Sequence, residues 1–347
     1  MGEMEAPMIL GNIHADGHSA NSLFALENTV HKHYPTDITR SLRDALLAQG
    51  LEVNTPDVNA GQPVAFDLHL EGRPLPASDR PRFLIALENP HINPLNADKD
   101  YCAQFDLVFA WDQRLMDLPH VVPLMVPHAL QTPPFASWEE RDIFSCLINA
   151  NKAFRAPEPG DLYLERLQTI RWHEKNALSD FQLYGMGWHK APPAYTPWGK
   201  LVRAGAMAWS KLKNQPAFPS YHGEVQLKSD VLVRAKFSYT YENSSDLPNY
   251  ITEKIFDSMV CGCVPVYWGA GNIEQWIPED CFIDRRKFAD TSDVHRYLHT
   301  IDQDRFARYQ TAMADFLAGP QADAFRLSVI SRKIAEQIAR SLNPAAL

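Results

Sequence analysis

The sequence lacks any apolar run long enough to cross a bilayer. Its longest apolar stretches, such as residues 121–126 and 263–268, are far shorter than the ~20 residues that a membrane-spanning helix needs. The start of the chain also lacks the basic residues and the long apolar segment of a secretion signal, and Gly2 is not followed by a myristoylation pattern. We therefore expect a cytoplasmic protein without a membrane span, and leave open a peripheral association with the inner face of the membrane.

Cysteine is scarce, and basic residues are outnumbered. The five cysteines form an odd set without a CxxC pair, so their pattern indicates neither a disulfide framework nor a zinc site, and we expect buried thiols. The chain has 33 Lys and Arg against 42 Asp and Glu, a net charge of −9. Because this charge repels a phosphate backbone, we expect no nucleic-acid partner.

The chain is long enough for two domains. It has 347 residues, 45% of them hydrophobic, and a domain usually holds about 150 residues. Residues 151–160, with Pro157 and Pro159, interrupt the pattern of secondary structure and are the candidate junction. We therefore expect an N-terminal domain over residues 1–155 and a C-terminal domain over residues 156–347.

Apolar strands alternate with amphipathic helices in both halves of the chain. A continuous apolar run, typical of a strand covered on both faces, occupies residues 81–90, and residues 105–111 and 121–127 are expected to be further buried strands. Residues 181–185 are expected to form a strand followed by a turn. Helical patterns occupy residues 39–49, which Gly50 ends, and residues 160–177. This alternation predicts α/β domains with largely parallel sheets. A helical stripe over residues 325–342 closes the chain, and we expect it to pack against one or both domains.

One β-loop-α-β unit in the second half carries the clearest chemistry. It comprises a strand at 236–241, a polar loop at 242–249, a helix at 250–260 and a strand at 263–269. Ligands of open α/β sheets bind where strands end and helices begin. Lys254 opposes the helix dipole there unless a diphosphate is bound, Glu253 can accept ribose hydroxyls, and Tyr250 can stack on a base. The alternative is that Glu253 only complements the dipole and Lys254 is a solvated charge.

This stretch closely resembles the donor-binding motif of the α-1,3-fucosyltransferases of glycosyltransferase family ten. The matching elements are Lys-Phe before the strand, Glu-Asn after it, Tyr-x-Thr-Glu-Lys at the helix start and Val-Pro-Val-Tyr-Trp-Gly in the next strand. The clear match covers residues 181–285. It implies that Glu253 binds the ribose, that Lys254 binds phosphate, and that Asn243 and Tyr250 belong to the pocket for GDP.

The resemblance also implies a GT-B type fold, in which two Rossmann-like domains face a cleft. The GDP-sugar would occupy the C-terminal domain and the acceptor the N-terminal one. One departure concerns Met186, which stands in or near a turn where the family commonly has a basic residue. Lys190 and Lys228 are the candidates for the second phosphate contact.

The catalytic base is expected in the N-terminal half. An inverting transfer needs a carboxylate that takes the proton of the acceptor hydroxyl while the diphosphate leaves from the opposite face of the sugar. Glu88 ends the apolar strand that begins near Phe83, and Glu88-Asn-Pro resembles the Glu-Ser-Pro that carries the family's proposed base. Taken alone, a strand-end Glu more often caps a loop or forms an ion pair, but the donor motif favours Glu88 as the base.

These patterns together predict an enzyme, an inverting glycosyltransferase that moves L-fucose from GDP-L-fucose to a glycan hydroxyl in an α-1,3 linkage. Its partners would be the GDP-sugar donor and a carbohydrate acceptor. No HExxH or comparable metal spacing occurs among six of the histidines, so no obligatory metal or other cofactor is expected; these are His14, His18, His31, His33, His91 and His128. The alternatives are a transferase for another GDP-sugar, a nucleotide-sugar-binding protein without turnover, and a dehydrogenase that uses the turn at Gly269-Ala-Gly.

Overall fold

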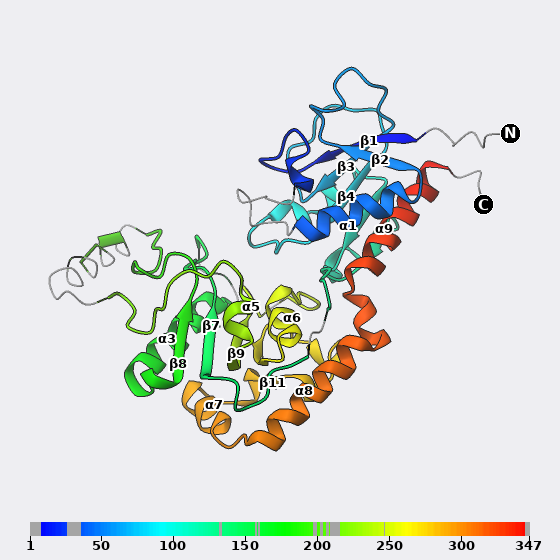
Figure 1. The fold of residues 1–347 in the computed structure, drawn as a ribbon. Coiled ribbons are helices and arrows are strands. Elements are labelled where there is room, and N and C mark those ends of the chain that lie inside the picture. The colour runs from blue at the N-terminus through cyan, green and yellow to red at the C-terminus, as the bar shows by residue number, and fades with distance from the viewer. Residues whose placement is uncertain are drawn as a thin grey trace. The chain divides into compact units, whose positions relative to one another are not determined.

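The structure of the chain is a computed structural model, drawn in Figure 1. It describes residues 8–25, 36–131, 134–156, 158, 160–196, 200–201, 204–205, 208, 216–245 and 247–343. The chain divides into two compact units. Unit 1 comprises Met1–Leu130 and Asp323–Leu347, and unit 2 comprises Gln131–Ala322. Each unit is built on its own parallel sheet with helices, which confirms the predicted α/β class.

Unit 1 contains a six-stranded sheet in the order β2-β1-β3-β4-β5-β6, in which every neighbouring pair is parallel. The central strand β4 has four of its five residues buried, because both faces of a parallel sheet are covered. The strands are β1 (Ile9–His14), β2 (Leu51–Asn54), β3 (Phe66–Leu70), β4 (Arg82–Ala86), β5 (Leu107–Ala110) and β6 (Val121–Pro123).

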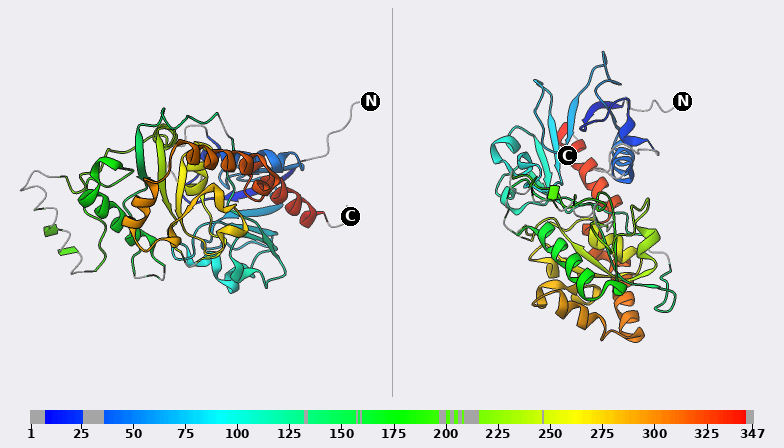
Figure 2. Two further views of the ribbon diagram at one scale, coloured as in Figure 1. Left: turned by 90° about the horizontal axis from the view of Figure 1, so that it is seen from below. Right: turned by 90° about the vertical axis from the view of Figure 1, so that its left-hand side faces the viewer.

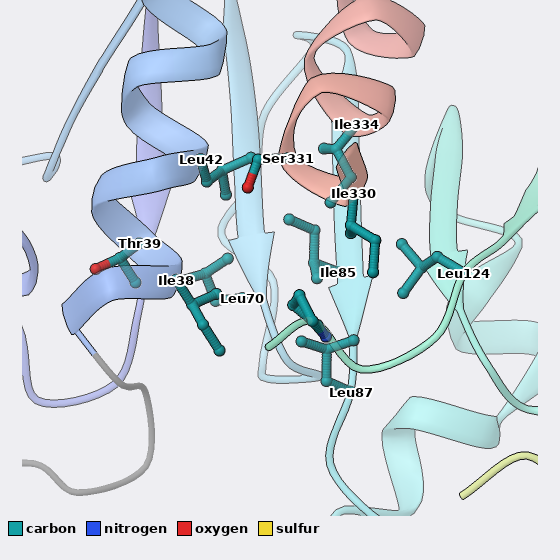
Figure 3. A pocket seen from close by; sticks show the side chains of 11 residues that line it. Ile38, Thr39, Leu42, Leu70, Ile85, Leu87, Leu124, Ile330, Ser331 and Ile334 are labelled. Carbon is teal, nitrogen blue, oxygen red and sulfur yellow. The ribbon is translucent and has the colours of Figure 1, made fainter. Parts of the chain in front are cut away.

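The helices of unit 1 come from both ends of the chain. They are α1 (Thr36–Leu47), the short α2 (Lys99–Cys102) and α9 (Leu327–Leu342). The C-terminal helix α9 lies beside α1, and both place apolar residues such as Leu46 and Ile338 in one core with the strands (Figures 1 and 2). Where these two helices approach the sheet, an apolar pocket remains (Figure 3). Its lining includes Ile38, Leu42, Leu70, Ile85, Leu124, Ile330 and Ile334.

Unit 2 contains a five-stranded parallel sheet in the order β11-β10-β9-β7-β8. Its strands are β7 (Ile143–Ile148), β8 (Phe181–Tyr184), β9 (Ala235–Tyr241), β10 (Val264–Trp268) and β11 (Ile283–Asp284). Among the described residues of unit 2, the helices include α3 (Leu162–Asn176), α5 (Ser229–Leu232), α6 (Glu253–Val260), α7 (Thr291–Leu298) and α8 (Gln303–Ala318). All five cysteines of the chain are buried free thiols, as expected.

The expected boundary between the domains lay between residues 155 and 156, and the observed division into units differs from it. The apolar segment β7 pairs with both β8 and β9, so the chain has entered the second sheet before residue 143. Residues 323–347 return to unit 1, because the apolar stripe of α9 is buried there. Pro157 and Pro159, on which the junction was inferred, lie outside the described residues. Among the helices that the structure describes, none is long and apolar enough to cross a membrane.

Candidate functional site

The candidate donor site lies in unit 2, where β9 ends and α6 begins. Because β7, β9 and β10 are parallel, their carboxyl ends meet at one edge of the sheet, which is where ligands of such sheets bind. Thr252 is the N-cap residue of α6, but its side chain does not cap the helix. Its hydroxyl is instead turned toward Glu242, the first residue after β9.

Glu242 is the buried centre of this site. Its side chain is fully shielded from solvent, and its two oxygens accept three hydrogen bonds. The backbone N–H of Thr252 donates over 2.8 Å, the hydroxyl of Thr252 over 2.7 Å, and the ammonium of Lys254 over 3.1 Å. A single carboxylate therefore fixes both the start of α6 and the side chain of Lys254.

Lys254 is charged although it lies in the protein interior. Its side chain is only 11% exposed, and its ammonium also donates to the hydroxyl of Thr252 over 2.9 Å. Burial opposes this charge, but the carboxylates of Glu242 and Glu253 outweigh burial and raise the pKa of the Lys254 ammonium. The solvated-charge alternative therefore does not describe Lys254.

A second lysine lies at the same place. Lys228 directly precedes α5, and its ammonium lies 2.7 Å from a carboxylate oxygen of Asp257 and 3.5 Å from one of Glu253. Lys228 and Lys254 line one small pocket together with Asp257 and with Asn149, which follows β7. Two ammonium groups beside a helix start can hold a diphosphate, and the phosphates would then replace carboxylates as partners of the lysines.

Asn243 and Tyr250 lie close together on the loop between β9 and α6. The amide N–H of Asn243 donates to the hydroxyl of Tyr250 over 3.3 Å, and the Tyr250 side chain is buried. Arg166 of α3, which is also buried, donates to the backbone oxygens of Tyr241 and Glu242 over 2.6 and 2.7 Å and to the side-chain oxygen of Asn243 over 3.1 Å. Arg166 thus holds the start of the loop between β9 and α6 in place.

The turn after β8 contains Met186, where the sequence departs from the family pattern of a basic residue. Gly185 has φ +118°, and a Cβ atom added there would lie 2.2 Å from the backbone oxygen of Asn149, so the turn packs directly against the end of β7. Met186 is exposed. Lys190 is exposed as well, and it is not part of the pocket lining. Of the two candidate replacements, Lys228 is the one that the structure brings beside Lys254.

Glu88 lies in unit 1, two residues after β4. Its side chain accepts a hydrogen bond from the backbone N–H of Asn89 over 2.7 Å and is partly exposed. The backbone N–H of Glu88 donates over 3.0 Å to the carboxylate of Glu71, which directly follows β3. Asn96 donates both to Glu71 and to the backbone oxygen of Glu88. The loop that carries Glu88 is therefore held by a second glutamate.

Glu71 is an acid of unit 1 whose pKa is raised. It adopts φ +66°, a left-handed conformation that residues other than glycine rarely take. Burial raises the pKa of Glu71 to about 7, against the lowering effect of the N–H groups of Glu88 and Asn96 that donate to it. A partly buried glutamate with a left-handed backbone and a raised pKa, beside the expected base, marks this loop as a candidate site for proton chemistry.

Sequence reasoning assigned no role to Glu242, Arg166 or Glu71, although Glu242 belongs to the Glu-Asn element of the family motif. For two of them, the sequence contains a pattern that could have indicated a role. Glu242 follows a buried strand without an intervening residue, and Arg166 stands four residues after Leu162 and four before Ile170, which places it on the apolar face of α3. For Glu71 we find no comparable signal, because its environment is created by residues far along the chain.

Comparisons with known proteins confirm the family resemblance. Residues 214–316 match the model of glycosyltransferase family 10 (fucosyltransferase), C-terminal part. The human 3-galactosyl-N-acetylglucosaminide 4-alpha-L-fucosyltransferase is 31% identical over 180 residues, which cover 44% of this chain and 49% of that protein. The human 4-galactosyl-N-acetylglucosaminide 3-alpha-L-fucosyltransferase is 34% identical over 140 residues, 34% of this chain and 37% of that protein. The chain thus matches about half or less of these relatives.

Solved structures confirm the fold over the whole chain. A crystal structure of an alpha1,3-fucosyltransferase with GDP aligns with a TM-score of 0.55 at 13% identity, and covers 99% of this chain and 92% of that one. Sucrose-phosphate synthase from Thermosynechococcus elongatus aligns with a TM-score of 0.60 at 11% identity, and covers 97% and 100%. Both likenesses support the GT-B type fold class that the sequence predicted.

Proposed function

We propose that the chain is an inverting glycosyltransferase that transfers L-fucose from GDP-L-fucose to a hydroxyl of a glycan, forming an α-1,3 linkage. The observation that carries this proposal is the pair of lysines, Lys228 and Lys254, at the start of α6. The pair lies inside the region that matches the fucosyltransferase family model, and a fucosyltransferase of similar fold has been crystallised with GDP.

Each residue of the donor site has a role in this proposal. Lys254 and Lys228 hold the diphosphate and neutralise the charge that develops on GDP as it leaves. Glu253, which is 44% exposed, accepts the ribose hydroxyls. Asn243 and Tyr250 form the neighbouring part of the GDP pocket, where Tyr250 must turn its buried ring for stacking. No metal ion is required for this charge neutralisation.

Glu88 is the proposed general base. Its carboxylate takes the proton of the acceptor hydroxyl, the hydroxyl oxygen forms a bond to the anomeric carbon of fucose, and the bond from that carbon to the phosphate oxygen breaks. Attack from the face opposite to GDP inverts the configuration at the anomeric carbon. Glu71 holds the backbone of Glu88 in place during this step.

The dehydrogenase alternative loses its main support in the structure. A Cβ atom at Gly269 would lie 2.3 Å from the hydroxyl oxygen of Tyr267 and 2.4 Å from the side chain of Glu242, so close packing requires this glycine. The turn is followed by the short 3-10 helix Ile273–Gln275 and not by an α-helix whose N-terminus could bind a pyrophosphate. A transferase for another GDP-sugar remains the second candidate, because the described contacts concern the nucleotide.

Calorimetric titration with GDP, GDP-fucose, GDP-mannose and NAD, followed by a turnover assay, tests the proposal. We expect binding of GDP and GDP-fucose, no binding of NAD, and release of GDP from GDP-fucose when galactosyl-N-acetylglucosaminides of both linkages are supplied as acceptors. Tighter binding and turnover of GDP-mannose would favour the second candidate. Binding of GDP-fucose without turnover across a broad acceptor panel would indicate a binding protein, and binding of NAD alone would refute the proposal.

A further inference from the structure

Three metal-ligating side chains of unit 2 converge outside the donor site. They are Asp180, at the end of the 3-10 turn Leu178–Asp180 that leads into β8, and His295 and His299 on α7 and its C-cap. The Nε2 atoms of His295 and His299 lie 3.0 and 2.9 Å from the same oxygen, Oδ2 of Asp180, and 3.2 Å from each other. Their spacing of four residues places both rings on one side of the helix.

While Asp180 is ionised, hydrogen bonds alone cannot satisfy this triangle. If both Nε2 atoms carry a proton, both donate to Asp180, and the contact between His295 and His299 then joins two donors. If one Nε2 atom is unprotonated, its short contact with the carboxylate joins two acceptors. Around an ionised Asp180, every arrangement of protons on the two rings therefore leaves one unfavourable contact. A cation at the centre removes the conflict, because all three lone pairs can then point inward.

The dimensions fit a small tetrahedral ion. Zinc binds His nitrogen and carboxylate oxygen at about 2.0–2.2 Å, so two ligand atoms of a tetrahedral site lie roughly 3.4 Å apart. The three distances in the structure need to grow by only a few tenths of an ångström to reach this value. Two imidazoles and one carboxylate are also a donor set for zinc-like ions and not for Mg²⁺ or Ca²⁺, which prefer oxygen ligands.

The surroundings hold the three side chains in place. The ring of Phe144 stacks on His299 with 4.4 Å between centroids, and the ring of Trp172 lies 5.1 Å from that of His295. The backbone oxygen of Asp180 accepts a hydrogen bond from the hydroxyl of Ser145 over 2.6 Å. The side chain of His299 is 48% exposed and that of His295 is 17% exposed, so the site is open to solvent on one side.

We propose that Asp180, His295 and His299 bind a divalent transition-metal ion of the zinc type, with water as the fourth ligand. The ion joins α7 to the turn that precedes β8, the edge strand of this sheet, and so stabilises unit 2. Neither helix α6 nor the donor-site lysines take part, and the inference does not depend on the proposed transferase activity. The ion has a structural role.

The test is a titration of the metal-stripped full-length chain with ZnCl2, read by calorimetry and by thermal denaturation. We expect one strong site, and a midpoint for unit 2 that rises by roughly 5–10 °C when free zinc exceeds the dissociation constant 100-fold. Titration with Co²⁺ should give the intense visible absorption of a four-coordinate ion. MgCl2 at the same concentrations should produce neither effect.

Three variants assign the site. His299→Ala removes an exposed ligand, Asp180→Asn keeps the shape of the side chain while removing its charge, and Arg296→Ala is the matched control, since Arg296 lies on the same helix and is 74% exposed. The first two should weaken zinc binding by at least about 100-fold, and the control should bind like the wild type. Circular dichroism of each variant checks that it is folded.

Equal zinc binding by His299→Ala and Arg296→Ala would overturn the proposal, as would the absence of a strong site in the wild type. If His299→Ala does not fold, the proposal is tested by comparing zinc binding by Asp180→Asn with zinc binding by Arg296→Ala. None of these measurements uses GDP or an acceptor, so failure of the metal site and failure of the proposed transferase function are distinguishable.

Discussion

Replacement of Glu242 by Gln should destabilise unit 2 strongly while preserving the shape of the site. The pair of Lys254 and Glu242 is separated by 3.1 Å, and the two side chains are 11% and 0% exposed. Removal of one partner leaves the ammonium of Lys254 buried without its main counter-charge, and an amide cannot accept all three hydrogen bonds that the carboxylate accepts. Breaking a buried pair in this way costs about 3–5 kcal/mol of unfolding free energy.

Thermal denaturation measures this cost. A loss of 1 kcal/mol lowers the midpoint by about 2–4 °C for a domain of 150–250 residues, so we expect a fall of roughly 6–20 °C for Glu242→Gln. The control is Glu253→Gln, which also removes a carboxylate near Lys254. Because Glu253 is 44% exposed and 3.8 Å from the ammonium, this variant should lose less than about 1 kcal/mol.

A double-mutant cycle shows whether the cost belongs to the pair. When Lys254→Met is added to Glu242→Gln, the buried ammonium disappears, and the double variant should be more stable than the sum of the single losses implies, by about 1–3 kcal/mol. A midpoint for Glu242→Gln within 2 °C of that of Glu253→Gln, or a coupling energy near zero, would refute the assignment of Glu242 as the buried counter-ion.

The remaining predictions concern binding, turnover and pH. Lys254→Ala should weaken GDP binding by about 1.5–3 kcal/mol and leave guanosine binding nearly unchanged, whereas Glu253→Ala should weaken both; calorimetry with the two ligands decides, and equal GDP affinity in Lys254→Ala would contradict the phosphate role. Glu88→Gln should reduce transfer by ~100- to 10,000-fold with GDP affinity altered less than about threefold, and more than about a tenth of wild-type turnover would place the base elsewhere. Because the pKa of Glu71 rises from 4.5 to about 7 on folding, its protonated form stabilises the folded state, and this contribution is complete below pH 4.5 and lost as the pH rises through 7. The difference in unfolding free energy between the wild type and Glu71→Gln should therefore fall, on the order of 3 kcal/mol, between these pH values, and a pH-independent difference in urea titrations would speak against a raised pKa.

The β9-α6-β10 unit could be predicted from the sequence, because local patterns determine it. The apolar run that ends at Tyr241 forms β9, and Gly262 follows the end of α6 with φ +65°. The helix begins at Glu253, three residues after the expected start at residue 250. The residues of the donor site were predicted as a group because one loop and one helix start carry most of them. Lys228 joins them from a separate segment, and only the family resemblance indicated it.

Other parts of the fold and of the candidate site depend on contacts between distant segments. The strand β3 contains the buried polar residues Asp67 and His69, so it lacks the apolar run that identifies β4. Asp67 is compatible with the interior because Arg80 and His14 contact its carboxylate, and Asn12 and Ser78 donate hydrogen bonds to it. The environment of Glu71 likewise comes from the loop after β4, and no local pattern of the sequence encodes such a pairing.

The position of α9 has a consequence for the order in which the chain can fold during synthesis. The core of unit 1 includes Ile330, Ile334 and Ile338, which leave the ribosome after every residue of unit 2. Unit 2 is one uninterrupted segment and can fold as soon as it has emerged from the ribosome. Unit 1 begins to be synthesised first, but it retains an exposed apolar face until α9 has been synthesised. A stop codon within α9 would therefore release a chain in which unit 2 is folded, while the exposed apolar surface of unit 1 is bound by chaperones or cleaved by proteases.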